Sequence, residues 1–218
     1  MAGRLIAVGD IHGCDRALQT LLEAVDVQAD DVVVTLGDYI DRGPASRQVV
    51  EQLMQLSSRC RLIPILGNHE LIFLAGLENE EDYESWLSFG GDQTLASYGG
   101  RVDEIPPEHI HFLATCRKYY ESDEHLFLHA NYVAHLPLES QSQYPLFWQH
   151  LTSSPPPRHR SGKTAIVGHT PQISGEILDW GHLICIDTWC FGGGWLTALD
   201  VRTRRLWQAN QAGALRPS

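Results

Sequence analysis

Five apolar segments of this chain end in the same way, and this repetition constrains the fold more than any other feature. Each apolar run is followed within a few residues by Asp, Asn or His, usually beside glycine. In the first segment, RLIAVGDIHG, Asp10 and His12 follow the apolar run. A simple turn would be served by Asn-Gly or Asp-Gly without an imidazole. The other segments supply Asp38, Asn68, His129 with Asn131, and His169.

The first half of the chain alternates between two kinds of periodicity. β-branched and apolar runs predict strands, and leucines at helical spacing predict amphipathic helices between them. Strands are expected at residues 4–10, 31–38 and 61–68, with helices at 16–27, 46–58 and 69–77. Ser46 is expected to cap the second helix. This alternation predicts a parallel sheet with helical crossovers.

The second half changes character after a helical stretch. Residues 78–118 are expected to form a helical cap region beside the sheet, with an acidic solvated face at its start. Trp86, inside that region, is expected to pack in the core or against the face of a sheet. Further strands are expected at 125–130, 164–169, 182–188, 195–201 and 204–210. Their short length and Gly-rich links favour a second, largely antiparallel sheet.

Composition limits the class of protein. The chain has 218 residues, 43% of them hydrophobic, which is compatible with a single domain over residues 1–218. Its formal net charge of −11 disfavours a nucleic-acid partner, and no apolar run is long enough for a membrane partner. The five cysteines show no CxxC pair, and the N-terminal run is short for a secretion signal. We therefore expect reduced thiols and a cytoplasmic location.

The strand-end residues form a set of ligands without thiolate. The carboxyl edge of a parallel sheet is where ligands bind, so these side chains are expected to meet there. Taken singly, a Gly-Asp is most often a turn or helix cap, and a lone His is usually a core residue. The joint pattern favours a metal centre. Its oxygen and imidazole donors suit manganese, with iron or zinc as alternatives, and exceed the needs of one tetrahedral ion.

Three motifs resemble those of the phosphoprotein phosphatase family within the calcineurin-like metallophosphoesterases. They are GDIHG (9–13), GDYIDRG (37–43) and GNHE (67–70), in that order. HAN at 129–131 and VGHT at 167–170 resemble the later histidine motifs of the family. The likeness is to the bacterial serine/threonine protein phosphatase type, related to symmetrical diadenosine tetraphosphate hydrolases. It implies an α/β fold, a β-sandwich of two mixed sheets flanked by helices.

The resemblance also assigns expected roles. Asp10 and His12 resemble ligands of a first divalent metal ion, and Asp38 resembles a ligand that bridges to a second. The remaining expected ligands of the second ion are Asn68, His129 and His169. His69 resembles the general acid, oriented by Asp41.

Arg42 resembles a phosphate clamp, and Asn131 and His150 are expected to help bind substrate. Two positions depart from the family pattern. Leu66 precedes GNHE where many members have Arg, and His150 stands at another position that is often Arg.

The resemblance implies a dinuclear metal-dependent phosphatase. The expected reaction is hydrolysis of phosphomonoesters by a metal-bound hydroxide, with phosphoserine or phosphothreonine in a phosphorylated protein as the substrate. A small phosphorylated substrate is the alternative, with the chain acting as a symmetrical bis(5′-nucleosyl)-tetraphosphate hydrolase. A third possibility, a binding protein without catalysis, is disfavoured because Asp41, Arg42 and His69 are all present.

Overall fold

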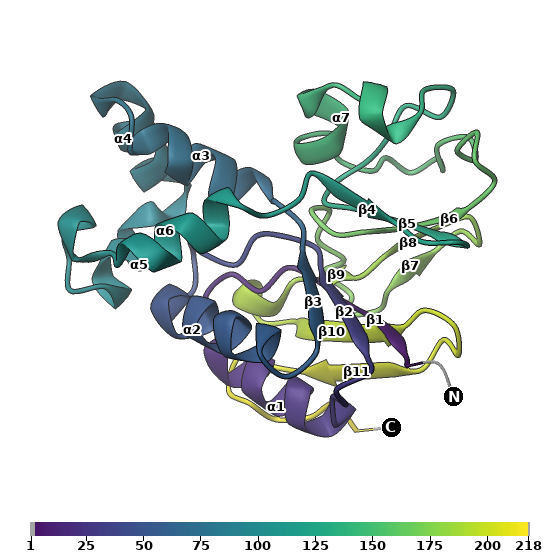
Figure 1. Cartoon of the computed structure of the whole chain (residues 1–218), viewed down its shortest axis with the longest axis horizontal. Helices are drawn as coiled ribbons and strands as arrows, with labels where there is room; N and C mark the ends of the chain where they lie inside the picture. Colours follow the sequence, from purple (N-terminus) through teal and green to yellow (C-terminus); the bar gives the residue numbers. More distant parts are fainter. Residues whose placement is uncertain (1–2, 218) are drawn as a thin grey trace.

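Two β-sheets stack against each other, and helices lie outside them (Figure 1). The computed structural model describes residues 3–217. The fold is therefore α/β with two mixed sheets flanked by helices, as expected from the sequence. None of the helices in this range has both the length and the apolar character needed to cross a bilayer.

The first sheet joins strands from both ends of the chain. Its strands are β1 (Leu5–Val8), β2 (Val32–Thr35), β3 (Arg61–Pro64), β9 (Asp187–Thr188), β10 (Trp195–Asp200) and β11 (Leu206–Ala209). The parallel order β1–β2–β3 follows from the predicted crossovers. On its other side β1 pairs antiparallel with β10, which pairs with β11 and β9.

The second sheet is mixed. Its order is β4-β5-β6-β8-β7, with a parallel centre and antiparallel edge strands. Its strands are β4 (Tyr119–Glu121), β5 (His125–Leu128), β6 (Thr164–Val167), β7 (Leu178–Asp179) and β8 (Leu183–Cys185). The prediction of a largely antiparallel sheet from the second half was wrong. The last strands leave for the first sheet, and the short edge strands β4 and β7 have little periodicity to mark them.

Alternation along each strand builds two cores. In β1, Leu5 and Ala7 face the core between the two sheets, where Phe127, Ile166 and Leu199 also lie. The intervening residues of β1 belong to the larger core, which also contains the buried faces of α1 and α2. A strand buried on both faces requires an apolar run without polar interruptions, and that is the pattern of these segments.

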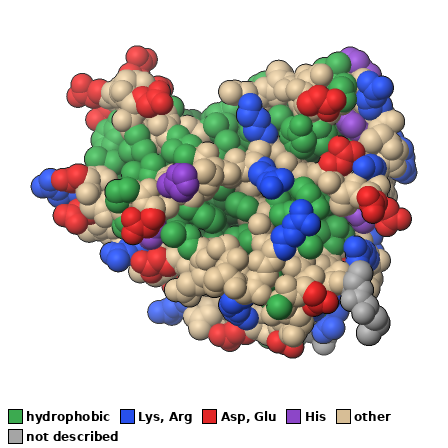
Figure 2. Space-filling model, viewed as in Figure 1, with side chains coloured by type: hydrophobic (Ala, Val, Ile, Leu, Met, Phe, Trp, Pro, Cys, Tyr) green, Lys and Arg blue, Asp and Glu red, His purple; other side chains and the backbone are tan. Residues whose placement is uncertain are grey.

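Seven α-helices surround the sheets. They are α1 (Asp15–Val25), α2 (Ser46–Ser57), α3 (Asn68–Gly76), α4 (Glu80–Trp86), α5 (Asp92–Ser97), α6 (Pro107–Ala114) and α7 (Gln143–Phe147) within the described residues. The helices α3 to α6 group at the left of the view, and α7 lies apart from them, above the second sheet (Figure 1). The acidic side chains of α4 lie on the surface, as expected (Figure 2). Helix α5 was not predicted, because paired glycines flank it.

The expected cap of α2 is not used. Ala45 occupies the cap position without a side-chain hydrogen bond, and Ser46 is the first helical residue. The Ser46 hydroxyl instead accepts a hydrogen bond from the backbone N–H of Asp41 (3.2 Å) and contacts the Thr94 hydroxyl (3.0 Å). The Ser46 side chain therefore stabilises the loop that follows β2 and does not cap α2.

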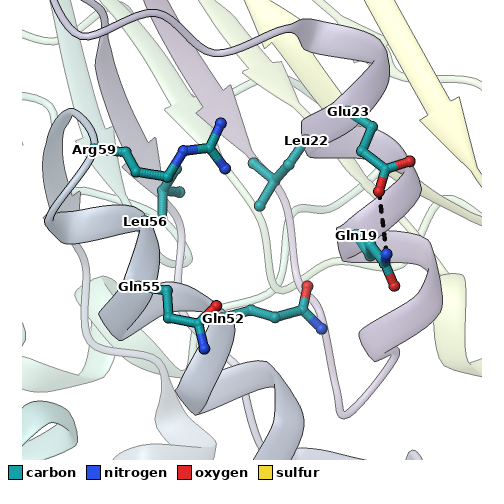
Figure 3. A pocket seen from close by; sticks show the side chains of 7 residues that line it. All are labelled: Gln19, Leu22, Glu23, Gln52, Gln55, Leu56 and Arg59. Carbon is teal, nitrogen blue, oxygen red and sulfur yellow. Dashed lines mark hydrogen bonds between the residues drawn. The ribbon is translucent and has the colours of Figure 1, made fainter.

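A hollow of about 420 Å³ lies between α1 and α2 (Figure 3). Leu22 and Leu56 supply its apolar lining, and Gln19 Nε2 donates to Glu23 Oε1 across one turn of α1 (3.1 Å). None of the acids or histidines that follow the strands lines it. The strand-end side chains meet elsewhere.

A buried carboxylate ties the start of β1 to the start of β2. Asp31 accepts hydrogen bonds from the backbone N–H groups of Arg4 and Gln28 (both 2.9 Å). Burial raises the pKa of Asp31, but the hydrogen bonds from Arg4 and Gln28 outweigh it and hold that pKa below its ordinary value. A carboxylate with a lowered pKa stabilises the fold above its unfolded pKa, and this contribution is lost as the pH falls through the folded pKa.

Asp31→Asn is expected to lower the free energy of unfolding by about 1–3 kcal/mol at pH 7, because an amide N–H would face a backbone N–H. The difference from the unaltered chain should shrink below about pH 4. Urea unfolding at both pH values measures it, with exposed Asp30→Asn as the control. Equal stability of the two variants at pH 7 would contradict the assignment.

Candidate metal centre

The side chains that follow the parallel strands meet in one pocket of about 240 Å³. This pocket lies where β1, β2, β3 and β6 end. The structure thus brings these side chains together at one edge, as the sequence predicted. The predicted residues that line it are Asp10, His12, Asp38, Arg42, Asn68, His69, His150 and His169. His129 lies beneath them, fully buried.

One group of ligand atoms gathers around His129. Its Nε2 lies 2.8 Å from Asn68 Oδ1, 3.2 Å from His169 Nδ1 and 3.5 Å from Asp38 Oδ1. Its Nδ1 donates to the carbonyl oxygen of Leu36 (2.7 Å), which leaves the Nε2 lone pair directed at the other atoms. Burial lowers the pKa of His129 and keeps the ring neutral.

A second group gathers around His12. The ring Nδ1 donates to the carbonyl oxygen of Ile40 (3.0 Å), so its Nε2 presents a lone pair 3.4 Å from Asp38 Oδ2. Burial lowers the pKa of His12 to about 3, which keeps the imidazole neutral. Asp38, His12 and His69 can each offer one atom within 4.8 Å of the others. Asp38 belongs to both groups, as a bridging ligand would.

Asp10 lines the same pocket without belonging to either of these two groups. Its Oδ2 accepts a hydrogen bond from the backbone N–H of His169 (2.9 Å), while its buried Oδ1 has no partner among the described residues. A Cβ at position 168 would overlap Asp10 Oδ1, so Gly168 allows this close approach. The free oxygen is available to a cation.

Several of these residues hold unusual backbone conformations. His12, Asp38, Asp41, Arg42 and His169 all have φ between 45° and 70°, in the left-handed region that L-residues rarely adopt. Each such residue costs on the order of 1 kcal/mol or more, and such strain concentrates at functional sites. The sharp turns direct successive side chains into the same pocket.

Glu70 holds two strand ends together, a role that the sequence analysis did not assign. Its carboxylate accepts backbone N–H bonds from Asp38 (2.9 Å), Tyr39 (2.8 Å) and Gly67 (2.9 Å). Burial and the charge of Asp38 raise the pKa of Glu70 to about 8. The available signal was an acid three residues after Gly67, at the start of a predicted helix, which is the spacing of a capping box.

His69 and Asp41 form a buried pair beside the two groups. His69 Nδ1 lies 2.8 Å from Asp41 Oδ2, so its Nε2 points away from Asp41 and has no partner among the described residues. The Asp41 carboxylate also accepts hydrogen bonds from Trp86 Nε1 (3.0 Å) and the Thr94 hydroxyl (2.7 Å). Trp86 is in the core as expected, but it also fixes this carboxylate.

The charges around His69 favour its protonated form. Burial alone would lower the pKa of His69. The nearby Asp38 charge and the hydrogen bond with Asp41 outweigh burial and raise that pKa above its ordinary value. A protonated imidazole donates a proton and does not bind a metal ion.

Asp187 is a further acid in the pocket that the sequence analysis did not assign. It is the first residue of β9, separated from β8 by the single buried residue Ile186, and is 4% exposed. Burial raises its pKa to about 7. Burial and the charges of Asp187 and Asp38 likewise raise the pKa of Asp10. The sequence signal for Asp187 was its position directly after the apolar run LICI.

The outer residues of the pocket are arranged around Arg42. Its guanidinium lies 4.9 Å from the centre of the Phe191 ring, with Nη1 3.4 Å from His12 Nε2. The His150 ring stacks on His169, with centroids 4.3 Å apart. Leu66, by contrast, is buried in the larger core and does not line the pocket.

Asn131 is not brought into this pocket. It lines a neighbouring groove, and its Oδ1 accepts a hydrogen bond from the backbone N–H of Tyr132 (2.8 Å). His150 lines both hollows, which are therefore adjacent.

The residues of this pocket fit divalent cations. Lone pairs of His129, His169 and Asn68 converge within about 3 Å, and buried carboxylates lie close enough to repel one another. A cation converts both repulsions into attraction. No cysteine belongs to either group of ligand atoms in the described residues, so the donors are nitrogen and oxygen, which suits manganese, iron or zinc.

The match to a family model is extensive. The model described as calcineurin-like phosphoesterase matches residues 3–197 of this chain. The chain therefore belongs to the calcineurin-like metallophosphoesterases, a family of hydrolases that use divalent metal ions.

Among curated proteins, the chain is similar to enzymes named symmetrical bis(5′-nucleosyl)-tetraphosphatase. The one from Paracidovorax citrulli (strain AAC00-1) is 44% identical over 72 residues, which are 33% of this chain and 25% of that protein. The one from Coxiella burnetii (strain Dugway 5J108-111) is 40% identical over 84 residues, 37% of this chain and 28% of that protein. The matched segments thus span little more than a quarter of these relatives.

Among solved structures, a protein described as a candidate diadenosine tetraphosphatase superposes with a TM-score of 0.75 and 23% identity, covering 96% of this chain and 94% of that one. A cold-active protein-tyrosine phosphatase of Shewanella superposes with a TM-score of 0.71 and 17% identity, covering 99% and 80%. At these identities the likeness establishes the fold alone.

Glu70→Gln is expected to lower both metal content and stability, because an amide N–H would face one of three backbone N–H groups. The unmet hydrogen bonds cost about 1–3 kcal/mol. Metal per chain, by elemental analysis after dialysis, and the midpoint of thermal unfolding measure the two effects. The control is Glu84→Gln on the exposed face of α4. Unchanged metal content in Glu70→Gln would contradict this role.

Proposed function

We propose that this chain hydrolyses dinucleoside tetraphosphates at the pocket described above, by cleaving a phosphoanhydride bond. The observation that carries the proposal is the convergence of nitrogen and oxygen metal-ligand atoms with the guanidinium of Arg42 and with His69 Nε2, which has no partner among the described residues, in one pocket. Bound divalent cations would polarise the phosphoryl group and lower the pKa of water. Asp10, His12, Asp38, Asn68, His129 and His169 would hold them, with manganese as the proposed metal.

His69 is proposed to act as the general acid. Its Nδ1 donates to Asp41, and its raised pKa favours the imidazolium form, in which Nε2 carries the second proton. Asp41 orients the ring and is itself fixed by Trp86 and Thr94. Donation from Nε2 to the departing oxygen removes the need to expel an unprotonated leaving group.

Arg42 is proposed to hold the phosphate. Its exposed guanidinium lines the pocket and rests on the face of Phe191, which limits the orientations it adopts. A planar guanidinium donates two parallel hydrogen bonds to phosphate oxygens. This charge, with the cations, would attract an anionic substrate to a chain of net charge −11.

The choice of substrate rests on the relatives. Those named symmetrical bis(5′-nucleosyl)-tetraphosphatase share 40–44% identity with this chain over their matched segments. They favour a nucleotide anhydride over a phosphoprotein as the substrate.

A phosphomonoester, including phosphoserine or phosphothreonine in a protein, is the second candidate. It is favoured by the size of the pocket, since about 240 Å³ admits a phosphate group but does not enclose a nucleotide.

A direct comparison of substrates tests the proposal. With manganese added, hydrolysis of diadenosine tetraphosphate and of a phosphoserine peptide is measured by product release under identical conditions. We expect the kcat/KM for the dinucleotide to exceed that for the peptide by at least about tenfold, a difference of about 1.4 kcal/mol in transition-state binding. A reversed ratio would establish the second candidate instead.

His69→Asn is expected to retain its metal while turnover of diadenosine tetraphosphate falls by about 10²–10⁴-fold, as loss of a general acid does. The loss should be much smaller for p-nitrophenyl phosphate, whose leaving group departs without a proton. Metal per chain and the two rates are measured together. Equal losses for both substrates, accompanied by loss of metal, would make His69 a ligand and not an acid.

A further inference from the structure

A second hollow of about 500 Å³ adjoins the metal centre and has no role in the reaction described above. It is a groove between residues 131–135 on one side and residues 149–157 on the other. His150 lines both this groove and the metal pocket, so the two lie next to each other. Asn131, two residues beyond His129, lies where the groove begins. A substrate held at the metal centre would reach this groove past the His150 side chain.

The walls of the groove are tied together by hydrogen bonds. Tyr132 Oη donates to the carbonyl of Pro157 (3.1 Å), and the backbone N–H of Arg160 donates to the carbonyl of Ala134 (2.8 Å). His182 Nε2 lies within hydrogen-bonding distance of the carbonyl oxygen of Pro156 (2.7 Å). Three consecutive prolines fix φ along one wall. The groove is thus formed before any ligand arrives, which reduces the entropy lost on binding.

The groove offers hydrogen bonds and apolar surface, and His135 and His150 are the basic side chains among the described residues that line it. Among the described residues that line it there is no Asp, Glu, Lys or Arg. Asn131 is 4% exposed, and no hydrogen bond within residues 3–217 engages its Nδ2. The side-chain amide of half-buried Gln149 is also without a partner in that range. These amides can donate to and accept from a ligand.

We propose that this groove binds a nucleoside end of the substrate while the phosphates lie at the metal centre. The inference rests on the proposed function and names the part of the chain that recognises the nucleotide. A nucleobase has apolar faces, which fit against proline rings, and an edge of donors and acceptors, which suits the amides of Asn131 and Gln149. A phosphate chain would instead require Lys or Arg side chains, which are absent among the described residues that line this groove.

Adenosine is the probe, because it has no phosphate to bind at the metal centre. Saturation-transfer NMR on the full chain, loaded with diamagnetic Zn²⁺, is expected to detect adenosine bound to the unaltered protein. Ala134→Trp should abolish the signal by filling the groove, without removing the backbone hydrogen bond from Arg160. Gln149→Ala should weaken binding roughly fivefold, the effect of one neutral hydrogen bond. Gln143→Ala, outside the groove on α7, is the matched control.

Kinetics provide a second readout. In Gln149→Ala and Ala134→Trp, the ratio of kcat/KM for diadenosine tetraphosphate to that for p-nitrophenyl phosphate should fall, roughly fivefold in the first variant. Gln143→Ala should keep the ratio of the unaltered chain. Circular dichroism verifies that each variant is folded.

The outcomes separate this inference from the proposed function. In one outcome, adenosine binding is weakened by Ala134→Trp and Gln149→Ala, but the unaltered chain does not cleave diadenosine tetraphosphate. That outcome would refute the proposed function and support the groove as a nucleoside site. Adenosine that binds all variants equally, or none, would overturn the groove assignment. So would a fall in kcat/KM confined to a phosphoserine peptide, since the groove would then bind polypeptide.

Discussion

The arrangement of this molecule depends on acceptor atoms that are held against their mutual repulsion. Lone pairs of His129, His169 and Asn68 converge near Asp38, and further carboxylates lie behind them. Such a cluster persists because backbone hydrogen bonds hold the loops that carry it. Glu70 binds the N–H groups of two of these loops, and the backbone N–H of His69 donates to Asp38 Oδ1 (3.1 Å).

The position of the site could be predicted from the sequence for a physical reason. Parallel strands joined by crossovers must end at the same edge, so residues that follow the apolar runs meet once the runs are recognised as strands. Asp10, His12 and Asp38 are of this kind. The placement of β10 could not be predicted, since its pairing of Asp200 with Ile6 joins segments 194 residues apart (200 − 6) and leaves no local pattern.

The roles of Trp86 and Glu70, which hold the site residues in place, could not be predicted. These roles depend on where each side chain points in the folded protein. Trp86 is apolar and fully buried, and only the position of α4 aims its Nε1 at Asp41. Glu70 has the spacing of an ordinary helix start, and the loops that it binds come from two different strands. The predicted substrate-binding residue Asn131 was not missed, but it lines the neighbouring groove, a placement that its motif with His129 does not indicate. Sequence identifies residue type, whereas orientation depends on the packed structure.

The division of the proposed ligands between the two sheets has a consequence for stability. Asp10, His12, Asp38 and Asn68 follow strands of the first sheet, whereas His129 and His169 follow strands of the second. An ion that binds both sets would link the two sheets, and the free energy of its coordination would add to the stability of their packing. Removal of such an ion would therefore weaken the attachment of one sheet to the other as well as the proposed chemistry of the pocket.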